Sequence, residues 1–281
     1  MARTTIIEDP ARPRWDGPGH RPLRVHVWQP EVPGPHPAVL LSHGTGGAAA
    51  DLSWLAESLA AAGVLVAGVD HHGNTRTDEY LPEGFAFVWE RPRDLTILLD
   101  HVLDRYDVDA ARVGVAGFSL GGYTAIALLG GRIDSAVAGL VIRGAVPMPP
   151  LPEFPDLVTR LRASWTDEAL AVRLAESGGS VADGRIRAGY AIAPSIGELV
   201  DVGSLGRVDR PLRIAWGDAD DNAFPDRNAL RYLAAVPSAS GLGLGPHVGH
   251  YDFLGHAPEG GDDARSRVAA DAVAFFERTL G

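Results

Sequence analysis

Two kinds of apolar pattern alternate along the chain. Short continuous apolar runs are typical of strands buried on both faces of a sheet. They occupy residues 38–42, 64–69, 113–118, 186–193 and 212–216. Between these runs, apolar residues recur at helical spacing, with Asp51 placed to cap the first helix. The expected helices span residues 51–62, 91–106, 120–129, 226–235 and 264–280. This order predicts an α/β fold with helices on both faces of a mostly parallel, twisted sheet.

Two segments depart from that rhythm. Residues 23–28 alternate apolar and polar positions, which predicts an antiparallel edge strand. Residues 131–184 begin with an apolar run, continue through a proline cluster at 147–155, and contain a helical pattern near 166–176. We expect one domain of 281 residues in which 131–184 is an insertion over the carboxyl edge of the sheet, acting as a lid or pocket wall. An ordinary extra strand–helix pair is the alternative.

Charge and composition narrow the class of protein. The chain is 46% hydrophobic and 22% charged, which is typical of a globular protein. Its 25 basic residues are all arginine, and its 36 acidic residues bring the net charge to −11. Such a charge repels phosphate backbones and anionic lipid, so neither nucleic acid nor a membrane surface is an expected partner. The absence of lysine excludes lysine Schiff-base chemistry.

The chain contains no cysteine, which excludes disulfide frameworks, thiolate metal sites and a cysteine nucleophile. Its longest uncharged apolar stretch, residues 59–69, is shorter than the ~18–20 residues needed to cross a bilayer. The N-terminal residues lack the apolar core of a secretory signal. We therefore expect a cytoplasmic protein.

The clearest chemical signal is a G-x-S-x-G pentapeptide over residues 117–121, centred on Ser119. A predicted buried strand precedes it and a predicted helix follows it, which is the strand–turn–helix context of a nucleophile elbow. Gly117 and Gly121 remove the side chains that would crowd so tight a turn. The turn also places the amide of Leu120 at a helix N-terminus, where it can bind an oxyanion. The alternative is a capping serine at a glycine-rich helix start.

A serine hydroxyl needs a base to take its proton, and the base needs an acid to orient it. In this kind of sheet the acid and the base follow the nucleophile along the chain, in that order. Asp218, Asp220 and Asp221 follow the predicted strand 212–216 and are candidates for the acid. We favour Asp220, with Asp221 second.

Two histidines near the C-terminus compete for the role of base. His250 is favoured over His247 because Gly249 lets the backbone bend and aromatic residues follow it. The pair also has the spacing His-x-x-His, but no helix is expected there and no third ligand is evident. We therefore expect neither a metal nor another cofactor.

A second oxyanion donor is expected from the loop that follows the strand at residues 38–42. This loop reads His43-Gly-Thr-Gly-Gly47, and its glycines let the main chain pass close to the nucleophile. The amide of Thr45 is the expected donor. The alternative, a phosphate-binding loop, would need a lysine or a dinucleotide glycine spacing that the loop does not have.

These residues resemble those of the α/β-hydrolase superfamily, and more narrowly of predicted dienelactone hydrolases and bacterial esterases similar to platelet-activating-factor acetylhydrolase. The resemblance is carried by the segments at residues 21–25, 41–47, 69–75, 91–95, 115–124, 185–188, 217–220 and 249–254. It implies an α/β-hydrolase fold, Ser119 as nucleophile, Asp220 as acid, His250 as base, and a helical insertion after the nucleophile helix. His72 departs from the family, which often has proline there, and the insertion diverges.

Several other side chains have two readings. His71 and His72 follow a predicted strand, so they either touch the substrate or hold the following turn by hydrogen bonds to the backbone. Met148, Phe154 and Trp165 either line an apolar acyl pocket or form the core of the insertion.

Taken together, the sequence predicts a serine hydrolase that cleaves a small carboxylic ester or lactone through an acyl-enzyme. An acyltransferase or cyclase of a biosynthetic pathway would use the same three residues and is the first alternative. A non-catalytic binding protein on the same scaffold is the second, although no member of the expected Ser-Asp-His set is missing.

Overall fold

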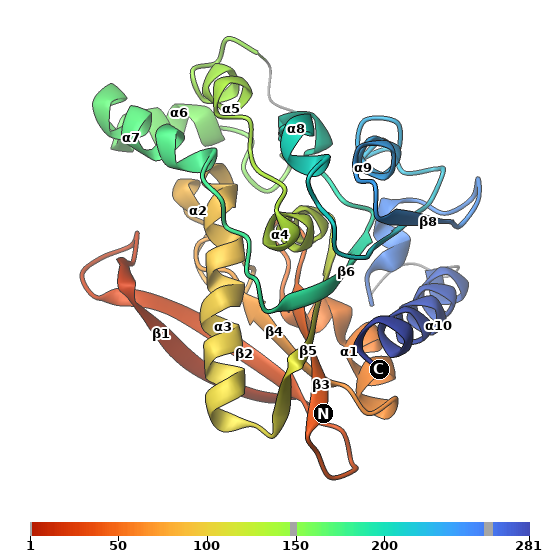
Figure 1. Cartoon of the computed structure of the whole chain (residues 1–281). Helices are drawn as coiled ribbons and strands as arrows, with labels where there is room; N and C mark the ends of the chain where they lie inside the picture. Colours follow the sequence, from red (N-terminus) through yellow and green to blue (C-terminus); the bar gives the residue numbers. More distant parts are fainter. Residues whose placement is uncertain (1, 147–150, 256–260) are drawn as a thin grey trace.

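The fold is built on one twisted sheet, seen in Figure 1. A computed structural model describes residues 2–146, 151–255 and 261–281. Within these residues, eight strands form a sheet in the order β1-β2-β4-β3-β5-β6-β7-β8. The strands are β1 (Arg3–Pro13), β2 (His20–Trp28), β3 (His36–Ser42), β4 (Leu65–Asp70), β5 (Val108–Phe118), β6 (Ile186–Ile192), β7 (Leu212–Trp216) and β8 (Ala239–Gly243).

Strand direction divides the sheet into two parts. All pairs from β4 to β8 are parallel, whereas β1 and β2 run antiparallel to their neighbours. The strand predicted over 23–28 is present as part of β2, but it is not the edge, because β1 pairs along its outer side. β1 escaped prediction since most of its residues are exposed and follow no apolar alternation.

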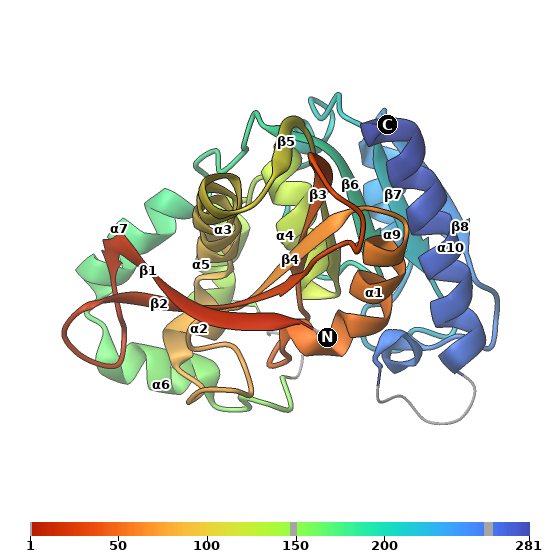
Figure 2. The ribbon, with the colours of Figure 1, turned by 90° about the horizontal axis from the view of Figure 1, so that it is seen from below.

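Helices cover both faces of the sheet, as predicted. They are α1 (Ser53–Ala61), α2 (Pro82–Ala86), α3 (Arg91–Arg105), α4 (Leu120–Leu129), α5 (Ser135–Ile142), α6 (Leu157–Ser164), α7 (Asp167–Ser177), α8 (Val202–Leu205), α9 (Ala229–Ala235) and α10 (Gly261–Leu280). In Figure 2, α1 and α10 lie on one side of the sheet, with α3 and α4 on the other. Each side has its own buried apolar cluster.

Two predicted helix starts are wrong for local reasons. Residues 226–228 form turns and α9 begins only at Ala229, because Asn228 turns its side chain back to accept from Gly197 N (2.8 Å) and to donate to Phe224 O (3.1 Å). Asp51 does not cap α1. It lies in a short 3₁₀ helix ahead of α1, where its carboxylate accepts from Ala48 N at 2.9 Å.

The insertion between α4 and β6 is helical, in agreement with the prediction. It contains α5, α6 and α7, which lie at the top of Figure 1 above the carboxyl ends of the strands. α6 packs on α2, and Phe154 and Leu157 form a small buried cluster there with Phe85. In the described part of the insertion, the β pairing is a single bridge between Ile133 and Val200, so an extra strand–helix pair is not formed.

Buried ion pairs fasten β1 to the start of α3. The Arg12 guanidinium donates to Glu90 at 2.8 Å and to Asp94 at 2.5 Å, and it also binds Asp9. Arg21 donates to the same Glu90 carboxylate at 2.8 Å. Because all five side chains are buried, loss of Arg12 would leave the Asp9 carboxylate in the interior without the guanidinium that pairs with it.

The first turn of α4 lies directly against the end of β3. A Cβ atom added at Gly121 would lie 1.9 Å from Ser42 O, and one added at Gly117 would lie 2.1 Å from Gly121 O. Backbone atoms cannot yield as a flexible side chain can. Both positions therefore require glycine for the turn to approach the sheet this closely.

We expect Gly121→Ala to lower the free energy of unfolding by about 1–3 kcal/mol or more, because the added methyl group forces α4 away from β3. Gly184→Ala is the matched control, since its Cβ would meet nothing within 4 Å. Urea unfolding of both variants measures the difference. Equal stability of the two variants would show that the contact is not a constraint.

Candidate active site

Ser119 lies at the sharp turn between β5 and α4. Its backbone has φ 54° and ψ −118°, a region that non-glycine residues rarely adopt. The strained turn is held by hydrogen bonds from Ser119 N to Ile192 O (2.8 Å) and from Gly122 N to Ser119 O (2.8 Å). Such a conformation persists only where the surrounding structure imposes it, and it is characteristic of functional sites.

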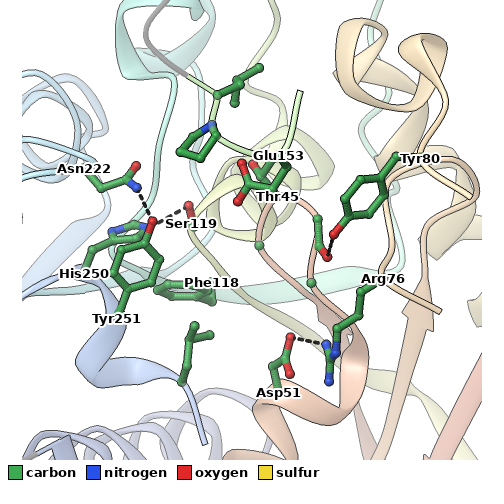
Figure 3. A pocket seen from close by; sticks show the side chains of 16 residues that line it. Thr45, Asp51, Arg76, Tyr80, Phe118, Ser119, Glu153, Asn222, His250 and Tyr251 are labelled. Atoms are coloured by element: carbon green, nitrogen blue, oxygen red, sulfur yellow. Dashed lines mark hydrogen bonds and ion pairs between the residues drawn. The ribbon is translucent and has the colours of Figure 1, made fainter. Parts of the chain in front are cut away.

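Three side chains from distant parts of the chain meet at this turn. Ser119 Oγ lies 3.0 Å from Nε2 of His250, and Nδ1 of His250 lies 2.7 Å from Oδ2 of Asp220. Because a carboxylate only accepts, Nδ1 carries a proton and Nε2 is free to accept from the hydroxyl. Figure 3 shows the serine and histidine facing each other.

The Asp220 carboxylate is fixed on its other side by the backbone. Asp220 follows β7, and its Oδ1 accepts from the amides of Asn222 (3.0 Å) and Ala223 (2.7 Å). The His250 ring packs 4.8 Å from the ring of Phe118. Orientation of the imidazole is thus determined by a hydrogen bond at one end and by aromatic packing on its face.

The competing candidates lie elsewhere. Asp218 and Asp221 are exposed, and Asp218 accepts from the indole of Trp216 at 3.0 Å. His247 is also exposed. Among the sequence candidates, the structure therefore brings only Asp220 and His250 to Ser119.

Two backbone segments pass close to Ser119. Leu120 is the first residue of α4, and the first amides of a helix have no partner within it. The loop after β3, residues 43–47 (the β3 loop), passes on the other side. A Cβ atom at Gly44 would lie 3.3 Å from the Cβ of Ser119, and Thr45 lines the adjoining pocket. Two chain segments, the start of α4 and the β3 loop, thus lie beside Ser119.

A pocket of about 570 Å³ opens next to Ser119. It is lined by Gly44, Thr45, Gly46, Gly47, Asp51, Arg76, Tyr80, Phe118, Ser119, Leu151, Pro152, Glu153, Asn222, His250, Tyr251 and Leu254. Figure 3 shows aromatic rings of Phe118 and Tyr251 near the serine, with Arg76, its partner Asp51 (2.7 Å) and Tyr80 across the pocket. The cavity therefore offers an apolar and a polar side.

Several of these lining residues were not anticipated. Asn222 and Tyr251 adjoin the predicted acid and base in sequence, and their side chains bond each other at 2.7 Å. Their positions next to the predicted acid and base in the sequence could have identified them as lining residues. Arg76 and Tyr80 lie in an irregular loop after β4, where no periodicity marks which side chains face a cavity.

His71 and His72 are not among the residues that line this pocket. After β4 the chain turns toward α3 and buries both rings. His71 donates from Nδ1 to Asp94 (2.7 Å) and accepts from the Ser42 hydroxyl at Nε2 (2.9 Å). His72 accepts from the backbone amide of Trp15 at 3.4 Å. Of the two roles considered for these histidines, His72 shows the hydrogen bond to the backbone, but its partner is the amide of Trp15 and not the turn that follows the two histidines.

The aromatic residues of the insertion form core rather than pocket. Phe154 is buried with its ring 5.1 Å from that of Phe85. Trp165 packs edge-on against Phe87 and donates from its indole to Glu83 at 2.8 Å. Met148 lies outside the described residues.

Burial governs the ionisation of the histidines behind the site. It lowers the pKa of His71 to about 4, with the nearby Arg91 charge acting in the same direction. Burial and Arg91 also hold the pKa of His43 well below its usual value. For Asp94, burial would raise the pKa, but Arg12 and His71 lower it. At neutral pH both imidazoles are uncharged and the carboxyl is ionised.

The sequence matches the model of a known protein family. The family model described as serine aminopeptidase, S33, matches residues 33–186, which is more than half of the chain. The chain belongs to this family of α/β-hydrolases. The matched region contains β3, the turn at Ser119 and the helices of the insertion, whereas Asp220 and His250 lie beyond it.

Two cutinases are among the curated proteins to which the chain is similar. The chain is 28% identical over 147 residues to the cutinases est1 and est2 of Thermobifida alba, a match that covers 50% of this chain. The match spans about two fifths (41%) of the length of those relatives.

Solved structures share the fold over nearly the whole chain. A ferulic acid esterase from Streptomyces cinnamoneus has a TM-score of 0.64 at 19% identity, covering 99% of this chain and 89% of that one. The esterase domain of a Rhodothermus marinus protein has a TM-score of 0.58 at 14% identity, with both chains covered fully. These likenesses establish the α/β-hydrolase fold.

Over residues 2–146, 151–255 and 261–281, no cluster of three or more His, Asp or Glu side chains has the arrangement of a metal site. In the same residues no helix has the length and apolar character needed to cross a bilayer.

The burial of neutral His71 predicts a pH-dependent stability. Its folded pKa lies below that of an unfolded histidine, so the unfolded state binds more protons between pH 6.5 and about 4. Stability contributed by this group is therefore complete above pH 6.5 and lost as the pH falls toward 4, at a rate of up to about 1.4 kcal/mol per pH unit.

Urea unfolding between pH 7 and pH 4.5 measures this slope. His71→Gln removes the titrating ring and should give a shallower slope than the parent protein, whereas the exposed His247→Gln should leave the slope unchanged. Identical slopes for parent and His71→Gln would contradict the assignment.

Proposed function

We propose that the protein is a serine hydrolase that cleaves a small carboxylic ester or lactone through an acyl-enzyme. The observation that carries the proposal is the continuous hydrogen-bonded chain from Ser119 Oγ through His250 to Asp220, placed beside a cavity. Oxygen, base and acid at these distances are what a serine nucleophile needs for activation.

In the first half-reaction, Ser119 Oγ attacks the ester carbonyl carbon while its proton passes to Nε2 of His250. Asp220 holds the other nitrogen as N–H, so that Nε2 presents its lone pair, and then stabilises the imidazolium that forms. His250 next donates its proton to the departing alkoxide, which leaves as the alcohol.

The carbonyl oxygen becomes negatively charged in the tetrahedral intermediate. The amides of Leu120 and Thr45 are the proposed donors to this oxyanion, one at a helix N-terminus and one from the β3 loop. In the second half-reaction, water gives a proton to His250 and attacks the acyl carbon. The bond from the acyl carbon to Ser119 Oγ then breaks, His250 returns the proton to Oγ, and the acid is released.

Similar proteins support an ester as the substrate. Cutinases and a ferulic acid esterase are among them by name, although the chain matches only part of the cutinases' length. The pocket volume suits a small molecule, and its two sides suit an ester with one apolar and one polar substituent. The resemblance to dienelactone hydrolases keeps lactones within the proposed class.

The insertion is proposed to act as a wall of this pocket. Leu151, Pro152 and Glu153, from the segment before α6, line the same cavity as Ser119, and Figure 3 shows Glu153 among the side chains of its wall. A wall of this kind limits the entry of water and of acceptor molecules to the acyl-enzyme.

Replacement of Ser119 by alanine should lower kcat for p-nitrophenyl acetate by roughly 10⁴–10⁶, because no other group is placed to attack the carbonyl. A fluorophosphonate probe should label the parent protein and fail to label this variant, as intact-protein mass spectrometry would show. A folded Ser119→Ala variant with the parent's rate would refute the proposal.

Replacement of Asp220 by asparagine should lower kcat by about 10⁴, because an amide no longer fixes the Nδ1–H tautomer of His250. Asp221→Asn is the matched control, since that carboxylate is exposed in the same loop, and its kcat should stay within about threefold of the parent. A similar loss of kcat in both variants would mean that the Asp220 substitution acts by disturbing the loop and not by releasing the tautomer of His250.

A further inference from the structure

A buried guanidinium lies behind the β3 loop, and the proposed reaction does not use it directly. Arg91 is the first residue of α3 and is only 2% exposed. We propose that Arg91, together with Asn74, is a positioning residue that fixes the β3 loop so that the amide of Thr45 meets the oxyanion. This inference rests on the proposed function.

Arg91 turns away from the nearby ion pairs and toward the loop. Its guanidinium donates to the carbonyl of His43, to Ser42 Oγ (3.3 Å) and to Asn74 Oδ1 (3.3 Å). Within the residues that the structure describes, all of its acceptors are therefore neutral oxygens. Arg12 and Arg21, in the same buried region, bind carboxylates instead.

Asn74 carries the attachment to the other end of the loop. Its Oδ1 accepts from the amide of Gly46 at 2.7 Å, and its Nδ2 donates to Gly84 O at 3.0 Å. Arg91 thus holds the loop at His43 and, through Asn74, at Gly46. Thr45 lies between the two attachment points.

The peptide group that contains the Thr45 amide is also oriented. The carbonyl of Gly44 belongs to this peptide and accepts from Nδ1 of His43 at 2.6 Å and from Gly47 N at 3.3 Å. In a trans peptide the N–H points opposite to the C=O. Fixing the carbonyl therefore fixes the direction of the Thr45 N–H.

The loop needs such anchors because of its composition. Three of its five residues are glycine, which has more backbone freedom to lose than any other residue. An oxyanion donor is effective only when it is already in place as charge develops. Burial lowers the pKa of Arg91 to about 9, which is a cost that an apolar residue at this position would not incur. We attribute the presence of an arginine here to its hydrogen bonds with the loop, which an apolar residue could not make.

The test is a comparison of matched arginine variants with short p-nitrophenyl esters. Arg91→Met should lower kcat about 10–100-fold while KM stays within about threefold, since a displaced donor acts mainly in the transition state. Arg21→Met is the control: it removes a buried arginine with no contact to the loop, and Glu90 keeps Arg12 and Arg173 as partners. Its kcat should remain within about threefold of the parent.

A second readout separates oxyanion binding from folding. A short alkyl trifluoromethyl ketone accepts Ser119 Oγ at its carbonyl carbon, the proton passes to His250, and the carbonyl oxygen becomes an oxyanion. Its inhibition constant should rise in Arg91→Met by the factor by which kcat/KM falls. The inhibition constant of the corresponding alcohol, which forms no oxyanion, should not change.

Asn74 variants keep the inference testable if Arg91→Met does not fold. Asn74→Asp retains an acceptor for Gly46 N and should keep kcat within about fivefold of the parent, whereas Asn74→Ala should lose tenfold or more. The inference is overturned if folded Arg91→Met or Asn74→Ala keeps both kcat and ketone affinity, or if Arg21→Met loses as much. A parent protein that neither hydrolyses esters nor reacts with fluorophosphonate overturns the proposed function itself.

Discussion

The site depends on how closely the first turn of α4 approaches the end of β3. Ser42 pairs with Gly117 across the sheet, and the space between Ser42 O and the backbone of Gly121 has no room for a methyl group. This contact forces Ser119 into its strained conformation and turns its hydroxyl toward the carboxyl edge of the sheet. His250, Asp220 and the β3 loop can act together on a substrate only if the Ser119 hydroxyl stays in this position.

A layer of buried polar side chains connects this contact with the outer strands. Arg12 of β1 donates to Glu90 and to Asp94 at the start of α3. Asp94 in turn accepts from His71, and His71 accepts from the Ser42 hydroxyl at the end of β3. Burying so many charges contributes little net stability compared with apolar packing. What the layer supplies is a defined position for the loops that surround the Ser119 turn.

The sequence alone allows prediction of those parts of the fold in which apolar residues follow a regular pattern. Buried parallel strands and amphipathic helices were predicted within a few residues, because continuous and periodic apolar runs mark them directly. β1 and β8 were missed because β1 is mostly exposed and β8 has no fully buried residue, so neither burial nor alternation distinguishes them from loops.

The site shows the same division between pattern and packing. Ser119, Asp220 and His250, which the structure brings together, could be predicted as neighbours because topology fixes where such residues come after strands. The buried contacts of His71, Arg91 and Asn74 could not be predicted, because they depend on the path of the irregular loops around them. Asp220 and Asp221 are adjacent in sequence, yet one is buried against His250 and the other is exposed.

The described part of the chain contains two hydrogen-bonded Ser-His-Asp arrays, and comparing them shows what chemistry requires beyond distances. Ser42, His71 and Asp94 are linked at 2.9 and 2.7 Å, nearly the values at Ser119, His250 and Asp220. Hydrogen-bond lengths therefore do not distinguish a reactive serine from a structural one.

Access and electrostatics do distinguish them. Ser42 is fully buried and does not line the pocket described above, and its oxygen also accepts from Arg91. Ser119 faces a cavity, and a helix N-terminus stands beside it where negative charge would form. Since burial also lowers the pKa of His71 to about 4, that imidazole is a weak base even when it is correctly oriented. The same three residue types thus serve as a structural link behind the sheet edge and as the proposed reaction centre in front of it.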